Sequence, residues 1–442
     1  MLNNSTVREI ENLKRSTPYR SISIRIIGLT HVARRTLAGL WKRDILIWVP
    51  AWVVGVIGLL HGFGRTYPDS YSYVAWARFF ADPNSAFIIG LKGLPLGSST
   101  VIVASRLVVP FLASLLINWT SVSWSFGIVN SVFWIGGSLI SYYIGKRLIS
   151  RSFGLASATF YAASTPMLAY GSSIVTDPAG YFFIGLALYL GLSTLGGQLS
   201  SKRAFAEGSV MAISLLANPV GFAAFSYAAT LRCSARRSLA LFLAGAALVL
   251  APVIILGVVT GLIGKLFDFW IRHKLIGAST PMTGGPALDA LAWTFNVSAV
   301  EMIPINRLLA IFSMSLPVTI FFFVLTVLLG FIYLPQKREL FLYAPFLLAY
   351  VFLAHAWIER YLFCLWPLLL PAILVGLREV LLILGRVASR LIPQIRRRTP
   401  PILADPLFFV AVFLDVQALV NLRDYLGLSS LATLLELVQN LV

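Results

Sequence analysis

The sequence predicts an all-α membrane protein, a polytopic bundle of about 10–12 transmembrane helices, and three observations predict this class. Of the 442 residues, 58% are hydrophobic and only 12% are charged, whereas soluble domains are about half apolar and a quarter charged. Apolar runs of about twenty residues, the length that crosses a bilayer, recur along the whole chain. The 35 basic residues outnumber the 17 acidic ones, but they lie mainly in short loops, where they orient spans rather than bind nucleic acid.

Residues 1–43 form a basic segment ahead of the first apolar run. Within it, residues 21–41 alternate apolar residues with Arg25, Arg34 and Arg35 at roughly helical spacing. This pattern predicts a helix on an anionic membrane face, with a solvated tail as the alternative. We expect no secretory signal peptide, because so long a polar and basic segment precedes the first apolar run.

The transmembrane domain is predicted at residues 44–400, and two long polar connections, 63–123 and 261–307, interrupt it. A further apolar pair at 405–421 and 425–442 makes residues 401–442 either a final hairpin or interfacial helices. The candidate spans of the main domain are 45–62, 124–144, 154–173, 178–195, 207–230, 239–260, 308–333, 340–356 and 361–384.

Residues 100–117 decide the predicted topology, because they are long enough to span but contain Arg106 and Pro110. A central Arg costs roughly 2.5–3.5 kcal/mol on insertion scales. We therefore predict that 100–117 lies in the outer interface or is re-entrant, and that 207–230 is two short helices broken at Asn218-Pro219. Most of the 35 basic residues then share the cytoplasmic side with the N-terminus, as the positive-inside rule requires.

This topology places both long connections on the extracytoplasmic face. Most acids outside the basic loops then gather there too, at span ends and in the two connections, and we expect a functional site among them. These acids are Asp69, Asp82, Asp177, Asp268, Asp289, Glu301 and Glu359.

Two of these acids stand at the start of predicted helices. Asp69 precedes an amphipathic helix that begins at Ser70, where apolar residues recur at spacings of three and four. Asp177 precedes Pro178 at the first turn of the span 178–195. Each acid fits a helix-capping role, which does not exclude catalysis, and both fall at the same predicted depth.

The stretch from His355 to Tyr361 opens a span at its outer end. Glu359, Arg360 and Tyr361 fit an interfacial belt, and an Arg at that depth also suits a phosphate at the headgroup level. His273, between Arg272 and Lys274, more often marks an interfacial basic cluster than a base. The further candidates for substrate binding are Arg78, His273, His355 and Glu359.

Metal and nucleotide motifs are absent from the sequence. Cys233 and Cys364 lie far apart, with no CxxC motif and no His/Cys cluster. Missing GxGxxG, P-loop and DxD signatures argue against a nucleotide-sugar enzyme on the inner face. No cofactor is certain, and a divalent metal ion stays open without a paired-acid motif, since Ser70 follows Asp69.

The order of these stretches resembles the GT-C superfamily of polytopic glycosyltransferases, which includes protein O-mannosyltransferases and bacterial lipid-linked sugar transferases. The resemblance covers roughly residues 45–385 and rests on spacing and residue character. It is carried by the acid in a long first outer loop, by Arg106 to Pro110, by Thr176-Asp177-Pro178, by Ala217-Asn218-Pro219 and by Arg360-Tyr361 followed by Pro367.

The resemblance implies an inverting transfer of a sugar from a polyprenyl phosphate donor to an acceptor on the outer face of the plasma membrane. Asp69 matches the loop acid, as base or as orienter of the acceptor hydroxyl, and Asp177 matches the second acid. Arg360, with Tyr361 and Arg106, matches the residues that would hold the donor phosphate. The implied partners are a polyprenyl-phosphate-linked sugar and membrane lipids, without nucleic acid, and the acceptor is open.

Two other classes of function stay open at this point. A transporter or flippase would also gather charges in a cavity, although such folds usually show internal repeats and helices broken at mid-membrane, and we find no convincing repeat. A noncatalytic scaffold could keep the fold and bind a lipid or a partner, and the single loop acid is its main support.

Overall fold

The computed structural model describes residues 49–67, 69–93, 106–164, 167, 170–194, 201–218, 221, 225, 228–229, 232, 236–268, 325–326, 328–330, 332–333 and 366–391. Every regular element within these residues is a helix, so the predicted all-α class is confirmed for them. The helices are α3 (Val49–His61), α4 (Ser70–Ala81), α5 (Ser85–Gly93), α7 (Val108–Ile117), α8 (Val122–Leu148), α9 (Arg151–Ala162), α11 (Asp177–Thr194), α12 (Ser201–Ala217), α14 (Arg236–Val259), α15 (Leu262–Asp268) and α22 (Trp366–Leu391).

Most of the predicted spans that fall on described residues are confirmed as helices. Within the described part of the chain, α8 and α14 are long and apolar enough to cross a membrane by length and composition, and they coincide with the predictions 124–144 and 239–260. Helix α11 matches 178–195, α3 matches 45–62 from its first described residue, and α22 covers most of 361–384 and continues to Leu391. The N-terminal segment 1–43 and the spans 340–356, 405–421 and 425–442 lie outside the described residues, as does most of 308–333.

The predicted span 154–173 is wrong as a single helix. Helix α9 starts at Arg151 and ends at Ala162, and the backbone N–H of the next residue, Ala163, bonds back to the carbonyl of Thr159. Pro166 follows soon after, and a proline disfavours helical backbone at the residue before it. The run stays apolar past this point, so hydropathy alone missed the end of the helix.

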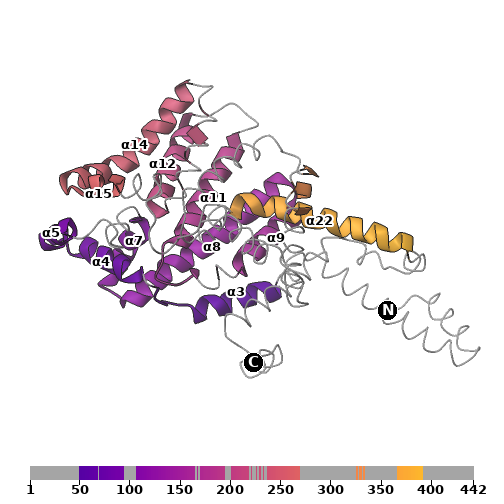
Figure 1. Cartoon of the computed structure of the whole chain (residues 1–442), viewed down its shortest axis with the longest axis horizontal. Helices are drawn as coiled ribbons and strands as arrows, with labels where there is room; N and C mark the ends of the chain where they lie inside the picture. Colours follow the sequence, from indigo (N-terminus) through magenta and orange to yellow (C-terminus); the bar gives the residue numbers. More distant parts are fainter. Residues whose placement is uncertain are drawn as a thin grey trace, which may run out of the picture.

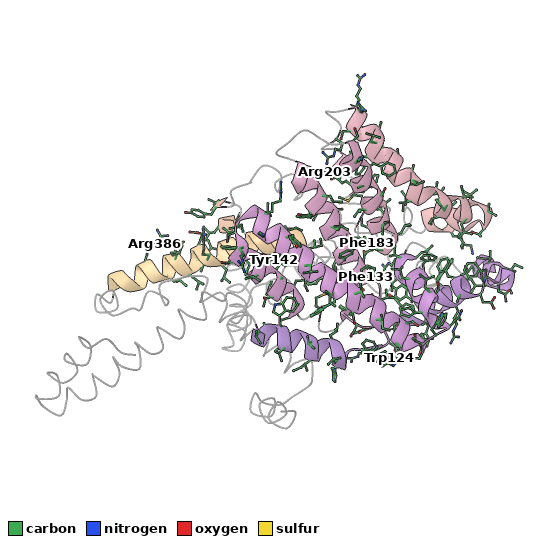
Figure 2. All side chains as sticks on the ribbon, turned by 180° about the vertical axis from the view of Figure 1, so that it is seen from behind. Trp124, Phe133, Tyr142, Phe183, Arg203 and Arg386 are labelled. Atoms are coloured by element: carbon green, nitrogen blue, oxygen red, sulfur yellow. The ribbon has the colours of Figure 1, made fainter. Side chains whose placement is uncertain are left out.

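The helices form a fan around α8, which is the longest described helix (Figure 1). Helices α9 and α11 pack directly on α8, α12 packs on α11, and α14 packs on α12. Helix α22 packs across α8, α9 and α11, and its later part extends beyond the bundle. Figure 2 shows Arg203 near the top of the view and Trp124 below it, with Phe133 and Phe183 between them, whose ring centroids are 5.4 Å apart.

Two glycines set how closely α12 and α14 approach. The backbone of α14 at Phe242 occupies the place where a Cβ on Gly208 would lie, and the backbone of α12 at Phe205 does the same at Gly245. Close backbone approach through small residues is the usual way that membrane helices pack, because lipid supplies no hydrophobic drive between them.

The long connection 63–123 folds into the short helices α4, α5 and α7 at one end of the bundle (Figure 1). Helix α7 begins two residues after Arg106 and has ten residues, about 15 Å, half the hydrocarbon thickness. Helix α7 by itself is therefore too short to cross a membrane. Residues 100–105 lie outside the described residues, so the interfacial or re-entrant placement of 100–117 stays a prediction. The predicted amphipathic helix after Asp69 is confirmed, because α4 buries Tyr73 and Trp76 while Tyr71 is 79% exposed.

The chain reverses direction after α12. Helix α12 ends at Ala217, and Gly221 then lies against the backbone of Ser214, one turn earlier in α12. Arg232 consequently meets Glu207, which precedes it by 25 residues, and its Nε donates to the carboxylate at 3.1 Å. A continuous helix would separate these residues by about 37 Å.

This reversal confirms the predicted break at Asn218-Pro219. It brings the basic stretch at Lys202-Arg203 to the same end of the bundle as Arg236-Arg237, because Glu207 and Arg232 belong to those two arms. Both partners of this ion pair are buried. Burying charges in this way is tolerated only when they are paired.

The glycine contact predicts that Gly208→Ala destabilises the protein by about 1–3 kcal/mol, because the added methyl group meets the backbone of α14. Gly90→Ala on α5 is the matched control, since a Cβ there meets nothing within 4 Å, and it should be neutral or slightly stabilising. Thermal unfolding in detergent measures both variants. Equal melting temperatures would contradict the close packing of α12 on α14.

The ion pair predicts that Glu207→Leu destabilises the protein by about 3–5 kcal/mol, because it leaves the Arg232 guanidinium buried without its carboxylate. Adding Arg232→Met should recover most of the loss, since an apolar pair of similar size often replaces a buried ion pair at little cost. Unfolding midpoints of the two single variants and the double variant test this coupling. Additive losses would show that the two side chains do not depend on each other.

Candidate active site

Two segments far apart in the sequence run side by side at the end of the bundle that holds α4 and α7. The backbone N–H of Gly64 donates to the carbonyl of Ser172 at 3.0 Å, and that of Ile174 donates to the carbonyl of Arg65 at 2.9 Å. The hydroxyl of Ser70 donates to the carbonyl of Ile174 at 2.7 Å. The chain that carries Asp69 is therefore fixed against the chain that leads into Asp177.

The hydroxyl of Tyr73 joins three of these segments. Arg106 donates from Nη1 to this oxygen at 3.2 Å, and Thr176 donates from Oγ1 to the same oxygen at 3.5 Å. All three side chains are buried. Helix α4, the residues before α7 and the turn before α11 thus meet at one phenol oxygen.

Asp177 and Asn218 extend this contact to α11 and α12. The side-chain amide of Asn218 lies 3.5 Å from Oδ1 of Asp177, and both residues are fully buried. We call this set the polar junction; its members are Tyr73, Arg106, Thr176, Asp177 and Asn218. It places a carboxylate and a guanidinium in one buried region, where electrostatic interactions are stronger than in water.

The predicted capping roles of the two acids need correction. Asp177 is the first residue of α11 rather than its N-cap, since the N–H of Gly180 bonds to the carbonyl of Thr176. An acidic residue in the first turn is still favoured by the helix dipole. Asp69 occupies the N-cap position of α4, but its side chain makes no capping hydrogen bond. The α4 N-terminus therefore does not use the Asp69 carboxylate as a cap.

Asp69 differs from Asp177 in exposure. It is half-buried one turn before Tyr73, whose backbone N–H donates to the Asp69 carbonyl at 3.3 Å, whereas Asp177 is fully buried. A half-buried carboxylate can reach a substrate hydroxyl, and a fully enclosed one is suited to orienting neighbouring groups. The two acids therefore differ in how accessible they are to a ligand.

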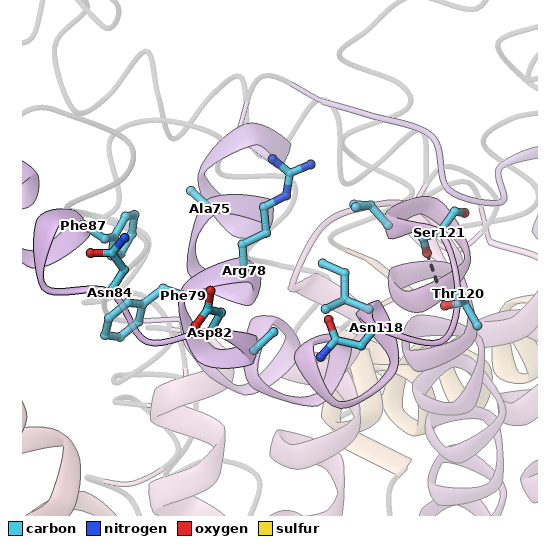
Figure 3. Close-up of a pocket in the computed structure, with 12 residues that line it drawn as sticks. Ala75, Arg78, Phe79, Asp82, Asn84, Phe87, Asn118, Thr120 and Ser121 are labelled. Carbon is cyan, nitrogen blue, oxygen red and sulfur yellow. Dashed lines mark hydrogen bonds between the residues drawn. The ribbon is translucent and has the colours of Figure 1, made fainter.

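The structure brings some of the predicted residues together and separates others. Asp69, Asp177 and Arg106 lie at the polar junction or beside it. Arg78, on α4, is exposed and lines a groove beside the junction (Figure 3). The remaining predicted site residues, His273, His355, Glu359, Arg360 and Tyr361, lie outside the described residues. Among the described residues no group of three or more His, Cys, Asp or Glu could hold a metal ion.

Sequence reasoning assigned no role to three residues that build the site. Tyr73 and Asn218 stood inside motifs that we singled out, but nothing in the sequence showed that they meet Arg106 and Asp177. Asn130, fully buried in the first half of α8, donates from Nδ2 to the carbonyls of Ser173 at 2.5 Å and Val175 at 2.9 Å. A polar amide inside an apolar span is a recognisable signal, and here it holds the turn before α11 in place.

The chain has a fold that is already known from solved structures. Two solved structures of ArnT from Cupriavidus metallidurans share this fold with it. The structure bound to undecaprenyl phosphate matches with a TM-score of 0.52 and 12% identity, covering 87% of this chain and 77% of that chain. The apo structure matches with a TM-score of 0.55 and 13% identity, covering 88% and 78%.

The sequence comparisons add no family to this likeness. No protein-family model matches the chain, and no curated protein matches it. The fold is therefore recognisable from the structure at an identity where the sequence alone shows only the resemblance described above.

The junction predicts that Tyr73→Phe lowers the free energy of unfolding by about 1–3 kcal/mol, because the buried donors of Arg106 and Thr176 lose the oxygen that accepts from them. Tyr71→Phe is the matched control, since Tyr71 lies on the same helix and is 79% exposed. Thermal melting of both variants tests the prediction. If Tyr73→Phe and Tyr71→Phe have the same melting temperature, the hydrogen bonds to the phenol oxygen do not contribute to the stability of the protein.

Proposed function

We propose that the chain is a membrane glycosyltransferase that moves a sugar from a polyprenyl-phosphate donor to an acceptor hydroxyl at the extracytoplasmic face, with inversion at the anomeric carbon. The observation that carries the proposal is the meeting of the segments that bear Asp69, Arg106 and Asp177 at one end of the bundle. The GT-C fold shared with ArnT, which binds undecaprenyl phosphate, supports the same donor class.

The proposed step is a single displacement. The acceptor oxygen forms a bond to the anomeric carbon while the bond from that carbon to the phosphate oxygen breaks, and the electron pair leaves with the polyprenyl phosphate. One displacement inverts the configuration. A sugar or other hydroxyl is a weak nucleophile, so it needs a base to accept its proton as the new bond forms.

Asp69 is the proposed base. It is half-buried one turn before Tyr73, and its side chain does not serve as the cap of α4. Asp177, fully buried and held by Asn218, is proposed to orient the acceptor side of the site. A base that is fixed within hydrogen-bond reach typically contributes 10²–10⁴-fold to the rate.

The donor phosphate gains charge as the sugar leaves, and a cation near it stabilises that charge where water is scarce. Arg106 is the cation that the described residues place at the junction. We propose that Arg360 and Tyr361 complete the phosphate site, and that His355 and Glu359 lie beside them. No step of this scheme requires a metal ion.

The orientation in the membrane follows from the charge distribution. The reversal after Asn218 puts Lys202-Arg203 and Arg236-Arg237 at one end of the bundle, and the polar junction lies at the end that holds α4 and α7. Basic loops stay in the cytoplasm. We therefore propose that the junction faces outward and that residues 1–43 are cytoplasmic.

Asp69→Asn should reduce sugar transfer by about 10²-fold or more, because the amide cannot accept the proton, while binding of undecaprenyl phosphate stays near that of the wild type. Transfer from a radiolabelled polyprenyl-phosphate sugar by purified protein is the measurement. Asp268→Asn is the matched control, since it ends α15, which supplies no member of the polar junction. Equal transfer by all three proteins would refute Asp69 as the base.

A further inference from the structure

A groove opens beside α4 at the end of the bundle that holds the polar junction. It lies between α4, the start of α5, the end of α7 and the turn that begins α8, and its volume is about 730 Å³, within the range of small-molecule sites. Figure 3 shows Phe87, Asn84 and Phe79 along one side, Asn118, Thr120 and Ser121 along the other, and Arg78 and Asp82 between them. We call it the end groove.

The polar lining of the end groove supplies donors and acceptors together. Arg78 offers guanidinium donors and Asp82 offers carboxylate acceptors, and both are exposed. Asn84 accepts the N–H of Ala86 at 2.8 Å through Oδ1, so the group that it presents to a ligand is its amide nitrogen. Asn118 supplies a second amide, with one donor group and one acceptor.

The hydroxyl groups that line the groove are less available to bind a ligand. Thr120 and Ser125 share a hydrogen bond at 2.8 Å, and Ser121 accepts from the N–H of Trp124 as the cap of α8. They therefore serve mainly to begin α8. The charged and amide side chains of Arg78, Asp82, Asn84 and Asn118 are the ones suited to recognising a ligand.

An aromatic wall completes the groove. The rings of Phe79 and Phe87 are stacked with their centroids 5.1 Å apart, and both line the cavity. Each ring also packs on Trp76, which is buried, so the wall is held in place by the core of this end of the bundle. A rigid apolar wall facing planar polar groups is the arrangement that binds a pyranose, whose C–H face is apolar and whose hydroxyls each donate and accept.

We infer that the end groove binds sugar residues of the acceptor, so that the acceptor is a glycan; this inference rests on the proposed function. Helix α4 connects the two sites, because it carries Tyr73 in the polar junction and Arg78 in the groove, and Asp82 follows its last residue. Exposed Trp119 and Trp124 flank the groove lining, and such residues mark the headgroup level of a membrane. The proposed base, Asp69, lies at the opposite end of α4, about 20 Å from Asp82, so an acceptor glycan would extend along α4 from the groove to reach it.

The mixed charge of the groove favours a neutral sugar over the other ligands of this size. A phosphate or carboxylate group would gain from Arg78 but would meet the carboxylate of Asp82. A peptide would use the aromatic wall, but an extended chain binds through the backbone of a strand edge, and the described lining comes from helices and helix ends. Sugar hydroxyls use both Arg78 and Asp82, because each hydroxyl is a donor and an acceptor.

The test measures binding, not transfer. Neutral trisaccharides (maltotriose, mannotriose and chitotriose) are added to the purified full chain in nanodiscs, and saturation-transfer NMR reports contact and affinity. We expect at least one trisaccharide to bind, and Asp82→Ala and Asn118→Ala each to weaken its binding about ten-fold or more. Tyr71→Ala is the control on α4, outside the groove, and should bind like the wild type; melting temperatures verify that the variants fold.

The outcomes separate this inference from the proposed function. The inference is overturned if no trisaccharide binds, or if Asp82→Ala and Asn118→Ala both bind it like Tyr71→Ala. It is also overturned if a Ser/Thr-rich peptide displaces the trisaccharide and this displacement depends on Asp82, because the groove would then bind peptides. Undecaprenyl phosphate binding is measured on the same variants and should be unchanged. If Asp69→Asn still transfers sugar while trisaccharide binding follows Asp82, the groove binds glycans but the proposed catalytic scheme fails.

Discussion

The architecture depends on satisfying polar groups that are buried where helices meet. Tyr73, Thr176, Asp177 and Asn218 have almost no exposure, and burying such groups without partners costs about 1–3 kcal/mol each. Tyr73 meets Thr176 and Arg106, and Asn218 meets Asp177, so stretches far apart in the sequence supply partners for one another. This requirement fixes α4, the residues before α7, the turn before α11 and the end of α12 together, and with them the position of Asp69.

The reversal of the chain at Asn218 allows the end of α12 to contribute to the polar junction. Because the chain turns back there, Asn218 reaches Asp177 while the two arms of the turn end in the Glu207–Arg232 pair far from the junction. The same turn keeps two basic stretches at one end of the molecule, as the proposed membrane orientation requires.

Helix α4 couples the catalytic and recognition halves of the proposed enzyme. Its buried face carries Ser70 and Tyr73, which hold the segment before α11, and its open face carries Arg78 in the end groove, where Asp82 follows its last residue. Trp76 packs on the phenylalanines of the groove wall. A ligand in the groove therefore contacts an element whose position the polar junction already determines, which is how a fixed base and a bound acceptor can be aligned.

The sequence by itself determined the all-α class, most spans, the amphipathic helix after Asp69 and the break at Asn218-Pro219, because hydropathy, helical spacing and proline act locally. It overextended α9 past Ala162, since an apolar run does not reveal where a helix ends. Only the tertiary structure decided that Tyr73 accepts hydrogen bonds from Arg106 and Thr176 and that Asn130 holds the turn before α11. It also decided that the Asp69 side chain does not cap α4. These contacts join residues 33 to 103 positions apart, a separation that no local pattern encodes.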